Sequence, residues 1–209
     1  MSNPMKLFHS PSSPFVRKCV VVAMEHGLEE RIERIAAAPS VLNRLPELEA
    51  ANPLGKVPAL QAQDGTWLFD SPVICEYLDS LAGGGMLPAQ GPARWRVLTL
   101  QALADGALDA AVLLRYEQAL RPEALRWDQW QAGQRAKIVG AVDMFERSLG
   151  DPPGDADKPD LGAIAAGCLL GYLDFRHPDI GWRTDRPALA AWYDRFAERA
   201  SMRATVPVG

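Results

Sequence analysis

The sequence predicts two domains: an α+β domain with the element order β-α-β-α-β-β-α, followed by an all-helical bundle. Two observations support this division. Short apolar segments of the kind that form strands occur only before residue 82, whereas helical spacing of apolar residues dominates after residue 92. The stretch between them contains Gly83-Gly84-Gly85, Pro88 and Gly91-Pro92, which is typical of a linker. We therefore expect domains at residues 1–82 and 92–209, joined by a linker at residues 83–91.

The first domain is expected to contain four strands and at least two helices. Its strands are predicted at Met5–His9 and at about residues 31–35, 57–61 and 66–69. Asp64-Gly65, between the last two strands, is typical of a hairpin turn. The first helix is predicted from residues that share one helical face: Phe15, Cys19, Val22, Ala23 and His26. The last helix covers residues 73–81, with Ser71 as its N-cap and Pro72 in its first position.

The second domain is expected to contain four helices, because apolar residues recur there at intervals of three and four. The four sets are Leu103, Ala107, Ala110 and Leu114; Ile138, Val142, Phe145 and Leu149; Leu161, Ile164, Ala165, Cys168, Leu169 and Tyr172; and Leu189, Trp192, Tyr193 and Phe196. The third set is apolar around most of the helix, so we expect that helix at the centre of the bundle, with Asp160 as its N-cap. Residues 151–155 are predicted to form a loop.

Composition and charge argue against several classes of partner. The chain has 209 residues and a net charge of −4, and its Lys and Arg residues form no basic stripe, so we expect no binding of nucleic acid. We find no run of about 18 apolar residues and no signal peptide in residues 1–4, and therefore expect a cytoplasmic protein without a membrane span. Cys19, Cys75 and Cys168 are widely separated in apolar helical patterns, which predicts buried thiols and no metal site.

The segment Ser10–Lys18 sets small hydroxyls at a helix start, directly after the first strand. The first backbone N–H groups of a helix have no partner within the helix and carry partial positive charge. An anion or a thiolate is stabilised at such a place. The sequence therefore predicts an anion- or thiolate-binding site in this segment.

Two further segments complete the candidate site. In the segment Asn52–Leu60, Pro58 is the second residue of a predicted strand, and proline has no N–H to donate to a neighbouring strand. We therefore expect the backbone groups of Val57 to remain free for an external partner. In the segment Phe69–Pro72, Ser71 opens a helix whose N–H groups can also meet an anion.

In their order and spacing, these three segments resemble the glutathione-binding domain of cytosolic glutathione transferases, which has a thioredoxin-like fold. The sequences SxxSPFVRK, NPLGKVPAL and FDSPVICEYLD are similar to a bacterial subgroup of that superfamily with serine at the thiol site. Residues 102–106 and 168–176 are similar to the helical domain of the same subgroup, so the resemblance extends over the whole chain. It implies a thioredoxin-like first domain, glutathione as co-substrate without a metal, a homodimer and a role in detoxification.

The resemblance also implies which hydroxyl activates the thiol. Ser13 matches the thiol-activating serine of the family and is the expected catalytic residue. Ser12 and Ser10 are close enough in the sequence to substitute for it. The alternative is that Ser13 only caps its helix, as serine often does.

Other residues are expected to bind the remaining parts of glutathione. The resemblance implies that the backbone of Val57 pairs with the cysteinyl amide and that the bond before Pro58 is cis. Asp70 would meet the α-ammonium group and Ser71 the α-carboxylate of the γ-glutamyl end. Lys56 is a candidate for the glycine carboxylate, with Arg44 or Arg17 as alternatives; a solvated turn lysine is an equally simple interpretation.

The expected activity is attack of the glutathione thiolate on a small, hydrophobic electrophile. A hydroxyl that donates to the sulfur favours the thiolate, which is the nucleophile. Because Val16 stands where a second redox cysteine would be needed, disulfide exchange is not expected. Two alternatives stay open. One is a non-catalytic protein of this fold that binds ligands or regulates a partner, and the other is a glutathione-dependent lyase or dehalogenase.

Overall fold

The computed structural model describes residues 4–149 and 158–209. Its contacts divide the chain into two compact units. One comprises the residues up to Pro88 together with Ala200–Gly209, and the other comprises Ala89–Arg199. The sequence analysis assigned the C-terminal segment to the helical domain, whereas its contacts place it in the first unit. The predictions for residues 1–3 and for the loop at 151–155 lie outside the described residues.

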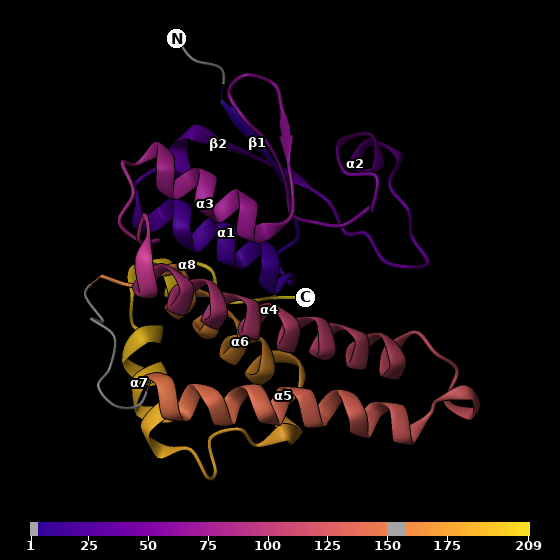
Figure 1. The fold of residues 1–209 in the computed structure, drawn as a ribbon. Coiled ribbons are helices and arrows are strands. Elements are labelled where there is room, and N and C mark those ends of the chain that lie inside the picture. Colours follow the sequence, from indigo (N-terminus) through magenta and orange to yellow (C-terminus); the bar gives the residue numbers. More distant parts are fainter. Residues whose placement is uncertain (1–3, 150–157) are drawn as a thin grey trace. The chain divides into compact units, whose positions relative to one another are not determined.

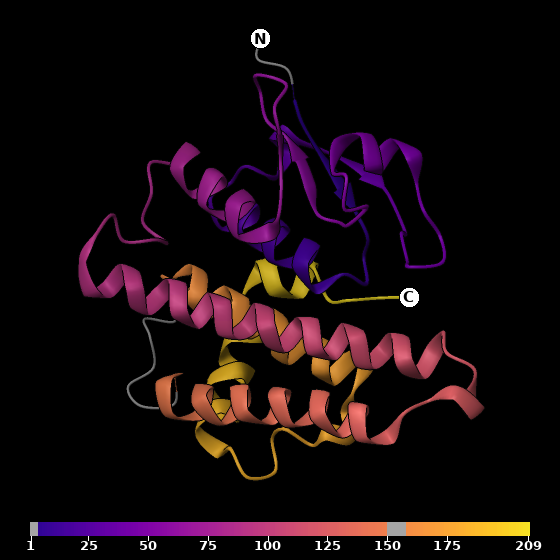
Figure 2. The ribbon, with the colours of Figure 1, turned by 45° about the vertical axis from the view of Figure 1, so that its right-hand side comes forward.

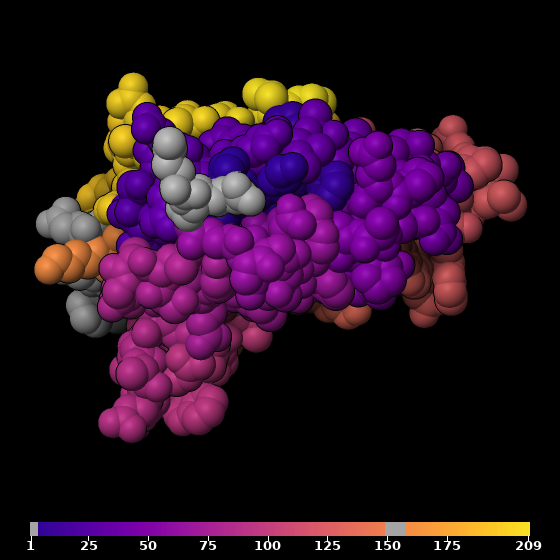
Figure 3. Space-filling view, turned by 90° about the horizontal axis from the view of Figure 1, so that it is seen from above, coloured from indigo at the N-terminus to yellow at the C-terminus, as the bar shows by residue number. Residues whose placement is uncertain are grey.

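The first unit is built on a mixed four-stranded sheet in the order β2-β1-β3-β4 (Figure 1). β1 runs parallel to β2 and antiparallel to β3, and β3 runs antiparallel to β4. The bounds are β1 Met5–His9, β2 Ile32–Ala36, β3 Ala59–Gln61 and β4 Trp67–Leu68. β1 is an inner strand, and Figure 3 accordingly shows the indigo N-terminal residues only in small areas between purple ones.

The four predicted strands are confirmed, with one difference at β3. This strand begins at Ala59 and not at residue 57. Pro58 has no N–H for a ladder, so regular pairing starts only after it. The predicted fold class, a small α+β domain followed by a helical one, is confirmed as well.

Helices cover both faces of this sheet. They are α1 Pro14–Glu25, α2 Pro46–Ala51 and α3 Ser71–Leu81, with a short 3-10 helix, η1, at Glu29–Arg31. Successive residues of a strand point to opposite faces. Leu7 of β1 lies with Val20 of α1 around a small cavity, whereas the neighbouring Phe8 belongs to an apolar cluster with Leu48 of α2. α1, which packs on α3, therefore covers one face, and α2 covers the other (Figure 1).

The start of α3 differs from the prediction by one residue. Asp70 is the N-cap, and Ser71 is the first helical residue. The carbonyl of Asp70 already accepts the N–H of Ile74 at 3.1 Å, although the backbone of Asp70 is still extended. This half-helical state defines an N-cap, so the prediction of Ser71 as the cap was wrong.

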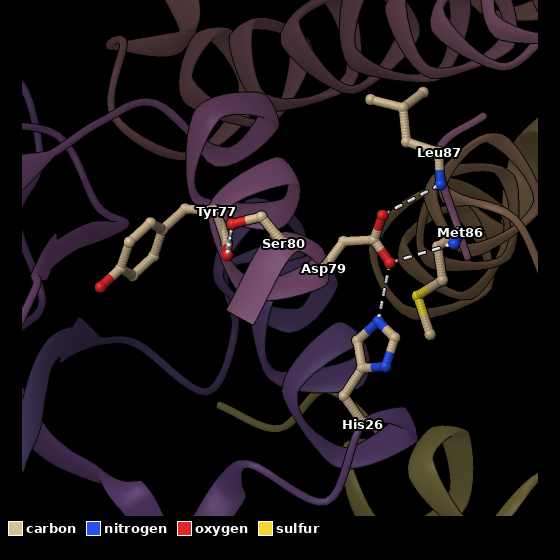
Figure 4. A network of polar contacts seen from close by, with 6 residues as sticks. All are labelled: His26, Tyr77, Asp79, Ser80, Met86 and Leu87. Carbon is tan, nitrogen blue, oxygen red and sulfur yellow. Dashed lines mark hydrogen bonds and ion pairs between the residues drawn. The ribbon is translucent and has the colours of Figure 1, made fainter. Parts of the chain in front are cut away.

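A buried carboxylate holds the segment that follows α3 (Figure 4). Asp79 is 3% exposed, and its two oxygens accept the backbone N–H groups of Met86 at 3.0 Å and Leu87 at 3.1 Å. One of these oxygens also lies 3.0 Å from Nε2 of His26, just after α1. Asp79 thus connects the ends of α1 and α3 with the glycine-rich segment that the sequence predicts as a linker.

The C-terminal segment is anchored to both ends of α1. It contains the short helix α8, Ala200–Ala204, which packs on α1. Near the start of α1, Arg17 donates to the carbonyl of Met202 at 3.0 Å. At the other end, Ser201 donates a short hydrogen bond to the Glu25 carboxylate. These polar contacts explain why the segment belongs to the first unit.

The second unit is a helical bundle (Figure 2). Its helices are α4 Gly91–Ala119, α5 Asp128–Leu149, α6 Leu161–Arg176 and α7 Pro187–Ala197, with the 3-10 helices η2 Glu123–Leu125 and η3 Pro178–Ile180. The four predicted helices are therefore confirmed. Every residue of α6 from Leu161 to Leu173 is buried, as expected of a central helix.

The start of α6 shows why its sequence is locally constrained. Asp160 caps the helix as predicted, accepting the N–H of Ala163 at 2.8 Å. Gly162 lies where α4 approaches, because a Cβ at this position would be only 2.9 Å from the Cβ of Leu100. A side chain larger than hydrogen would push the two helices apart.

α4 is the only helix of the described ranges that is long and apolar enough to cross a membrane, judged by length and composition alone. The sequence analysis predicted this helix but found no apolar run of membrane-spanning length, because polar residues interrupt the apolar stretch. Half of that stretch is buried inside the protein, and a core helix of a soluble protein passes the same test. α4 packs against α5 and α6, so its apolar residues contribute to the core of this unit.

His177, which follows α6, is fully buried. Its Nε2 lies 2.9 Å from the carbonyl oxygen of Ala111, so the neutral ring donates from Nε2. Nδ1 is buried and has no hydrogen-bond partner within the described ranges. Burial lowers the pKa of His177 below its ordinary value, although the bond to Ala111 acts in the opposite direction.

We expect Asp79→Ala to lower the free energy of unfolding by about 3 kcal/mol, because it leaves two buried N–H groups without an acceptor. Urea unfolding followed by circular dichroism measures this effect. Ser80→Ala is the matched control, since Ser80 is exposed and its hydroxyl donates locally to the carbonyl of Tyr77. Its expected change is within about 0.5 kcal/mol. Equal losses in the two variants would contradict the role assigned to Asp79.

We expect His177 to make stability depend on pH. Its pKa is lower in the folded chain than in the unfolded chain, where it is about 6.5. The contribution of the neutral ring is therefore complete above pH about 6.5 and is lost as the pH falls through the lowered folded pKa. Melting temperatures measured from about pH 7 to pH 5 should fall less steeply in His177→Asn. An imidazole that titrates at or above about 6.5 in the folded protein by NMR would contradict this account.

Candidate functional site

The strand register brings the three candidate segments to one edge of the sheet. Phe8, near the end of β1, pairs with Ala59 at the start of β3. Leu60 of β3 in turn pairs with Leu68 at the end of β4. The chain leaves β1 toward the serines, enters β3 from Val57 and leaves β4 toward Asp70, so all three segments meet at this edge. The spatial grouping that the sequence analysis predicted only from order and spacing follows from hydrogen-bonded pairing.

Ser13 occupies the N-terminus of α1. Its Oγ accepts the N–H of Val16 at 3.3 Å, and its own N–H donates to the carbonyl of Ser10 at 3.1 Å. Ser13 therefore caps the helix, which was one of the two interpretations of this residue. Because Oγ acts as acceptor in the cap, the hydroxyl hydrogen is available for an external acceptor. Capping and donation to a bound sulfur are thus compatible in one side chain.

Ser10 and Ser12, the second-choice hydroxyls, lie beside each other. Their Oγ atoms are 3.4 Å apart, and either one can be the donor. Ser10 is 9% exposed, whereas Ser12 and Ser13 are half-buried. Ser13 differs from both because it alone is the N-cap of α1.

His9 precedes this loop at the end of β1. Burial lowers its pKa, and Arg34 of β2 acts in the same direction. The ring is therefore neutral at pH 7, and His9 adds no positive charge to the loop.

The turn before Val57 is held by a buried amide that the sequence analysis did not identify. Asn52 is 1% exposed; its Nδ2 donates to the carbonyl of Lys56 at 2.8 Å, and its Oδ1 accepts the N–H of Leu54 at 3.1 Å. Gly55 adopts φ 62° in this turn and donates to the carbonyl of Asn52. The Asn-Pro pair is a turn signal that could have indicated this role.

Val57 presents its backbone at the edge of the sheet. The bond between Val57 and Pro58 is cis, as the family resemblance implies. In residues 4–149 and 158–209, the Val57 backbone takes part in no hydrogen bond of a turn, loop or strand ladder. Its N–H and C=O can therefore pair with an extended ligand, as an added strand would.

The start of α3 offers both signs of charge. Asp70 is exposed, and its carboxylate makes no capping hydrogen bond. Ser71 is 1% exposed, and the first N–H groups of α3 carry partial positive charge. The peptide bond between Phe69 and Asp70 is also cis. An ammonium group can meet Asp70 while a carboxylate meets the helix start.

The three basic residues considered for the glycine carboxylate have different surroundings. The guanidinium of Arg44 pairs with the Glu49 carboxylate, which raises the pKa of Arg44. Arg17 is buried and bonded to the C-terminal segment. Lys56 is exposed, and its ammonium group has no hydrogen bond or ion pair in the part of the chain that the structure describes.

The three thiols are buried in the protein and are not among the candidate site residues. Cys19, Cys75 and Cys168 are buried thiols, as predicted. Cys19 lies behind the start of α3, with its Sγ 3.9 Å from the carbonyl of Ser71. No group of three or more His, Cys, Asp or Glu residues within the described ranges is placed to hold a metal ion.

Two family descriptions match the chain. "Glutathione S-transferase, N-terminal domain" matches residues 12–81, and "Glutathione S-transferase, C-terminal domain" matches residues 128–195. Together they cover more than half of the chain and include Ser12, Ser13, the turn before Val57 and the start of α3.

Individual proteins are similar over nearly the whole length. The uncharacterized GST-like protein YibF of Escherichia coli K12 is 38% identical over 204 residues, which are 97% of this chain and 98% of that protein. A glutathione transferase family member from Pseudomonas fluorescens Pf-5, solved with bound glutathione, is 47% identical with a TM-score of 0.93, covering 98% of this chain and 100% of that chain. A second structure of a glutathione transferase family member from Pseudomonas fluorescens Pf-5, with bound S-(propanoic acid)-glutathione, has a TM-score of 0.88 at the same identity and coverage. The chain belongs to the glutathione S-transferase superfamily.

Proposed function

We propose that this protein is a glutathione transferase of the serine type. The observation that carries the proposal is the register that brings a helix-capping hydroxyl, an unpaired strand edge and a second helix start to one edge of the sheet. Similar proteins solved with glutathione or a glutathione derivative support the choice of co-substrate. A cytoplasmic homodimer without a resident metal, acting in detoxification, is part of the same proposal.

Each part of glutathione has a matching group in this arrangement. The unpaired backbone of Val57, before Pro58, would bind the cysteinyl amide and so place the sulfur near the serine loop. Asp70 would bind the α-ammonium group, and Ser71 with the first N–H groups of α3 the α-carboxylate. Lys56, which has no partner in the described chain, would meet the glycine carboxylate. With the other polar parts of glutathione bound in this way, its thiol would lie next to Ser13.

The chemical task is to ionise the thiol. Its ordinary pKa is about 8.5, by analogy with cysteine, so the thiol is mostly protonated at pH 7. A fall of about 2 units corresponds to roughly 2.7 kcal/mol of preferential stabilisation of the thiolate. The hydroxyl of Ser13 donating to sulfur and the positive end of α1 both contribute to this stabilisation.

The thiolate would attack an electrophilic carbon of a small hydrophobic acceptor. The sulfur lone pair forms the C–S bond, and the displaced electrons leave with the departing group or take up a proton. The S-(propanoic acid)-glutathione bound to a similar protein is a thioether, which is the class of product that such an attack gives. The lyase and dehalogenase alternatives use the same thiolate and differ in the acceptor. A glutathione-binding protein without a lowered thiol pKa would instead be the non-catalytic alternative.

We expect the thiol of glutathione bound to the wild-type protein to have a lowered pKa, and Ser13→Ala to raise it by about 1–2 units, because the donor to sulfur is lost. Thiolate absorbance titrated against pH measures both values. Ser12→Ala should keep the wild-type pKa. Ser13→Gly separates the two roles of the residue, since glycine costs the cap only a few tenths of a kcal/mol but supplies no hydroxyl. A wild-type thiol that is not shifted would contradict the proposed catalysis.

We expect Asn52→Ala to weaken glutathione binding roughly tenfold and to lower the free energy of unfolding by about 2 kcal/mol. The side chain holds the turn that presents Val57, so its loss acts on both properties. Isothermal titration and urea unfolding measure them. Asn43→Ala is the matched control, because Asn43 is exposed and its Nδ2 donates to the carbonyl of Ala38. Unchanged affinity in Asn52→Ala would show that the turn does not position the binding edge.

A further inference from the structure

Arg17 is a buried cation that has no carboxylate partner in residues 4–149 and 158–209. The residue is 6% exposed. Its guanidinium donates to two neutral oxygens, from Nη2 to the carbonyl of Met202 at 3.0 Å and from Nε to Oγ1 of Thr205 at 3.2 Å. Nη1 is buried and has no hydrogen-bond partner, and no carboxylate pairs with Arg17 in the part of the chain that the structure describes.

Such a group is costly unless a negative charge balances it. Removing a cation from water carries a large penalty, which neutral acceptors only partly offset. A buried and unpartnered N–H group calls for an explanation, and an anion that binds nearby in the working protein is one. The two hydrogen bonds fasten the C-terminal segment, but they leave the charge of Arg17 without a carboxylate partner among the described residues.

The position of Arg17 in α1 puts it near the candidate thiol site. Arg17 lies one helical turn after Ser13, and its own N–H donates to the carbonyl of Ser13 at 3.0 Å. Residues four apart share one face of a helix, so Arg17 lies on the face of α1 that begins with Ser13. The C-terminal segment that holds Arg17 runs back to the same loop, because a Cβ on Gly209 would be 3.9 Å from the Cβ of Ser12.

We propose that Arg17 supplies a fixed positive charge to the thiol site, and that the C-terminal segment holds this charge in place through Met202 and Thr205. The inference rests on the proposed function, because the anion is the thiolate of bound glutathione. Ser13 provides the hydrogen bond to sulfur, and Arg17 adds a full positive charge. His9, the other basic residue next to the loop, is neutral at pH 7 and cannot serve in this way.

The alternative is that Arg17 only fastens the C-terminal segment to α1. A fastening role and a charge role predict different results for the thiol. Loss of the fastening lowers the melting temperature and leaves the pKa of a bound thiol unchanged. Loss of the charge raises that pKa even where the fold is intact.

The test compares Arg17→Met and Arg17→Gln, which remove the charge, with Arg17→Lys, which keeps it. Thiolate absorbance of bound glutathione is titrated against pH for each variant, and the pH dependence of conjugation is measured with a small aryl halide. We expect the neutral variants to raise the thiol pKa by about 1 unit and to lower the thiolate fraction near pH 6 roughly tenfold. Arg17→Lys should stay within a few tenths of a unit of the wild type, about the level expected of the exposed control Arg31→Met.

Three outcomes would overturn the inference. If Arg17→Met or Arg17→Gln binds glutathione with the wild-type thiol pKa, the charge has no role, while the proposed transferase function stands. If Arg17→Lys raises the pKa as much as the neutral variants, the geometry of the guanidinium and not its charge is responsible. If the wild-type thiol is itself not shifted, both this inference and the proposed function fail.

Discussion

The position of β1 inside the sheet is the constraint on which the first unit depends. β1 pairs in parallel with β2 on one side and antiparallel with β3 on the other. The parallel pair requires a crossover, which α1 provides, and the antiparallel pair brings the start of β3 to the end of β1. Because β3 also pairs antiparallel with β4, the end of β4 reaches the same edge. One inner strand thus gathers three loops that lie far apart in the sequence.

The electrostatics of that edge follow from backbone geometry. α1 and α3 both begin there, and each helix start carries partial positive charge. Under our proposal Arg17 of α1 adds a full charge, and Asp70 supplies a negative group at the start of α3. The edge therefore suits a ligand with several charges of both signs, which describes glutathione better than a simple anion. Specificity would come from the order of these charges along the edge.

The sequence predicted the local features of this protein well. Asp160 and Ser13 are N-caps because a short polar side chain before a helix can satisfy the first N–H groups wherever the helix ends up. Among the described residues, the Val57 backbone has no turn or ladder partner, because Pro58 cannot continue a ladder. The errors were also local and small. β3 begins two residues later than expected, and α3 is capped one residue earlier, since element boundaries depend on hydrogen bonds that the sequence does not show.

The sequence by itself determined the fold class, the helix and strand order, the buried thiols and the residues that can cap or leave an edge open, because these properties depend on neighbours along the chain. Only the tertiary structure decided which groups meet. Arg17 and Thr205 are separated by 188 positions, and no periodicity relates them. The same holds for His26 and Asp79, and for the membership of α8 in the first unit. Burial and pairing between distant segments are set by packing, and packing decides whether a charged side chain such as Arg17 is solvated or buried.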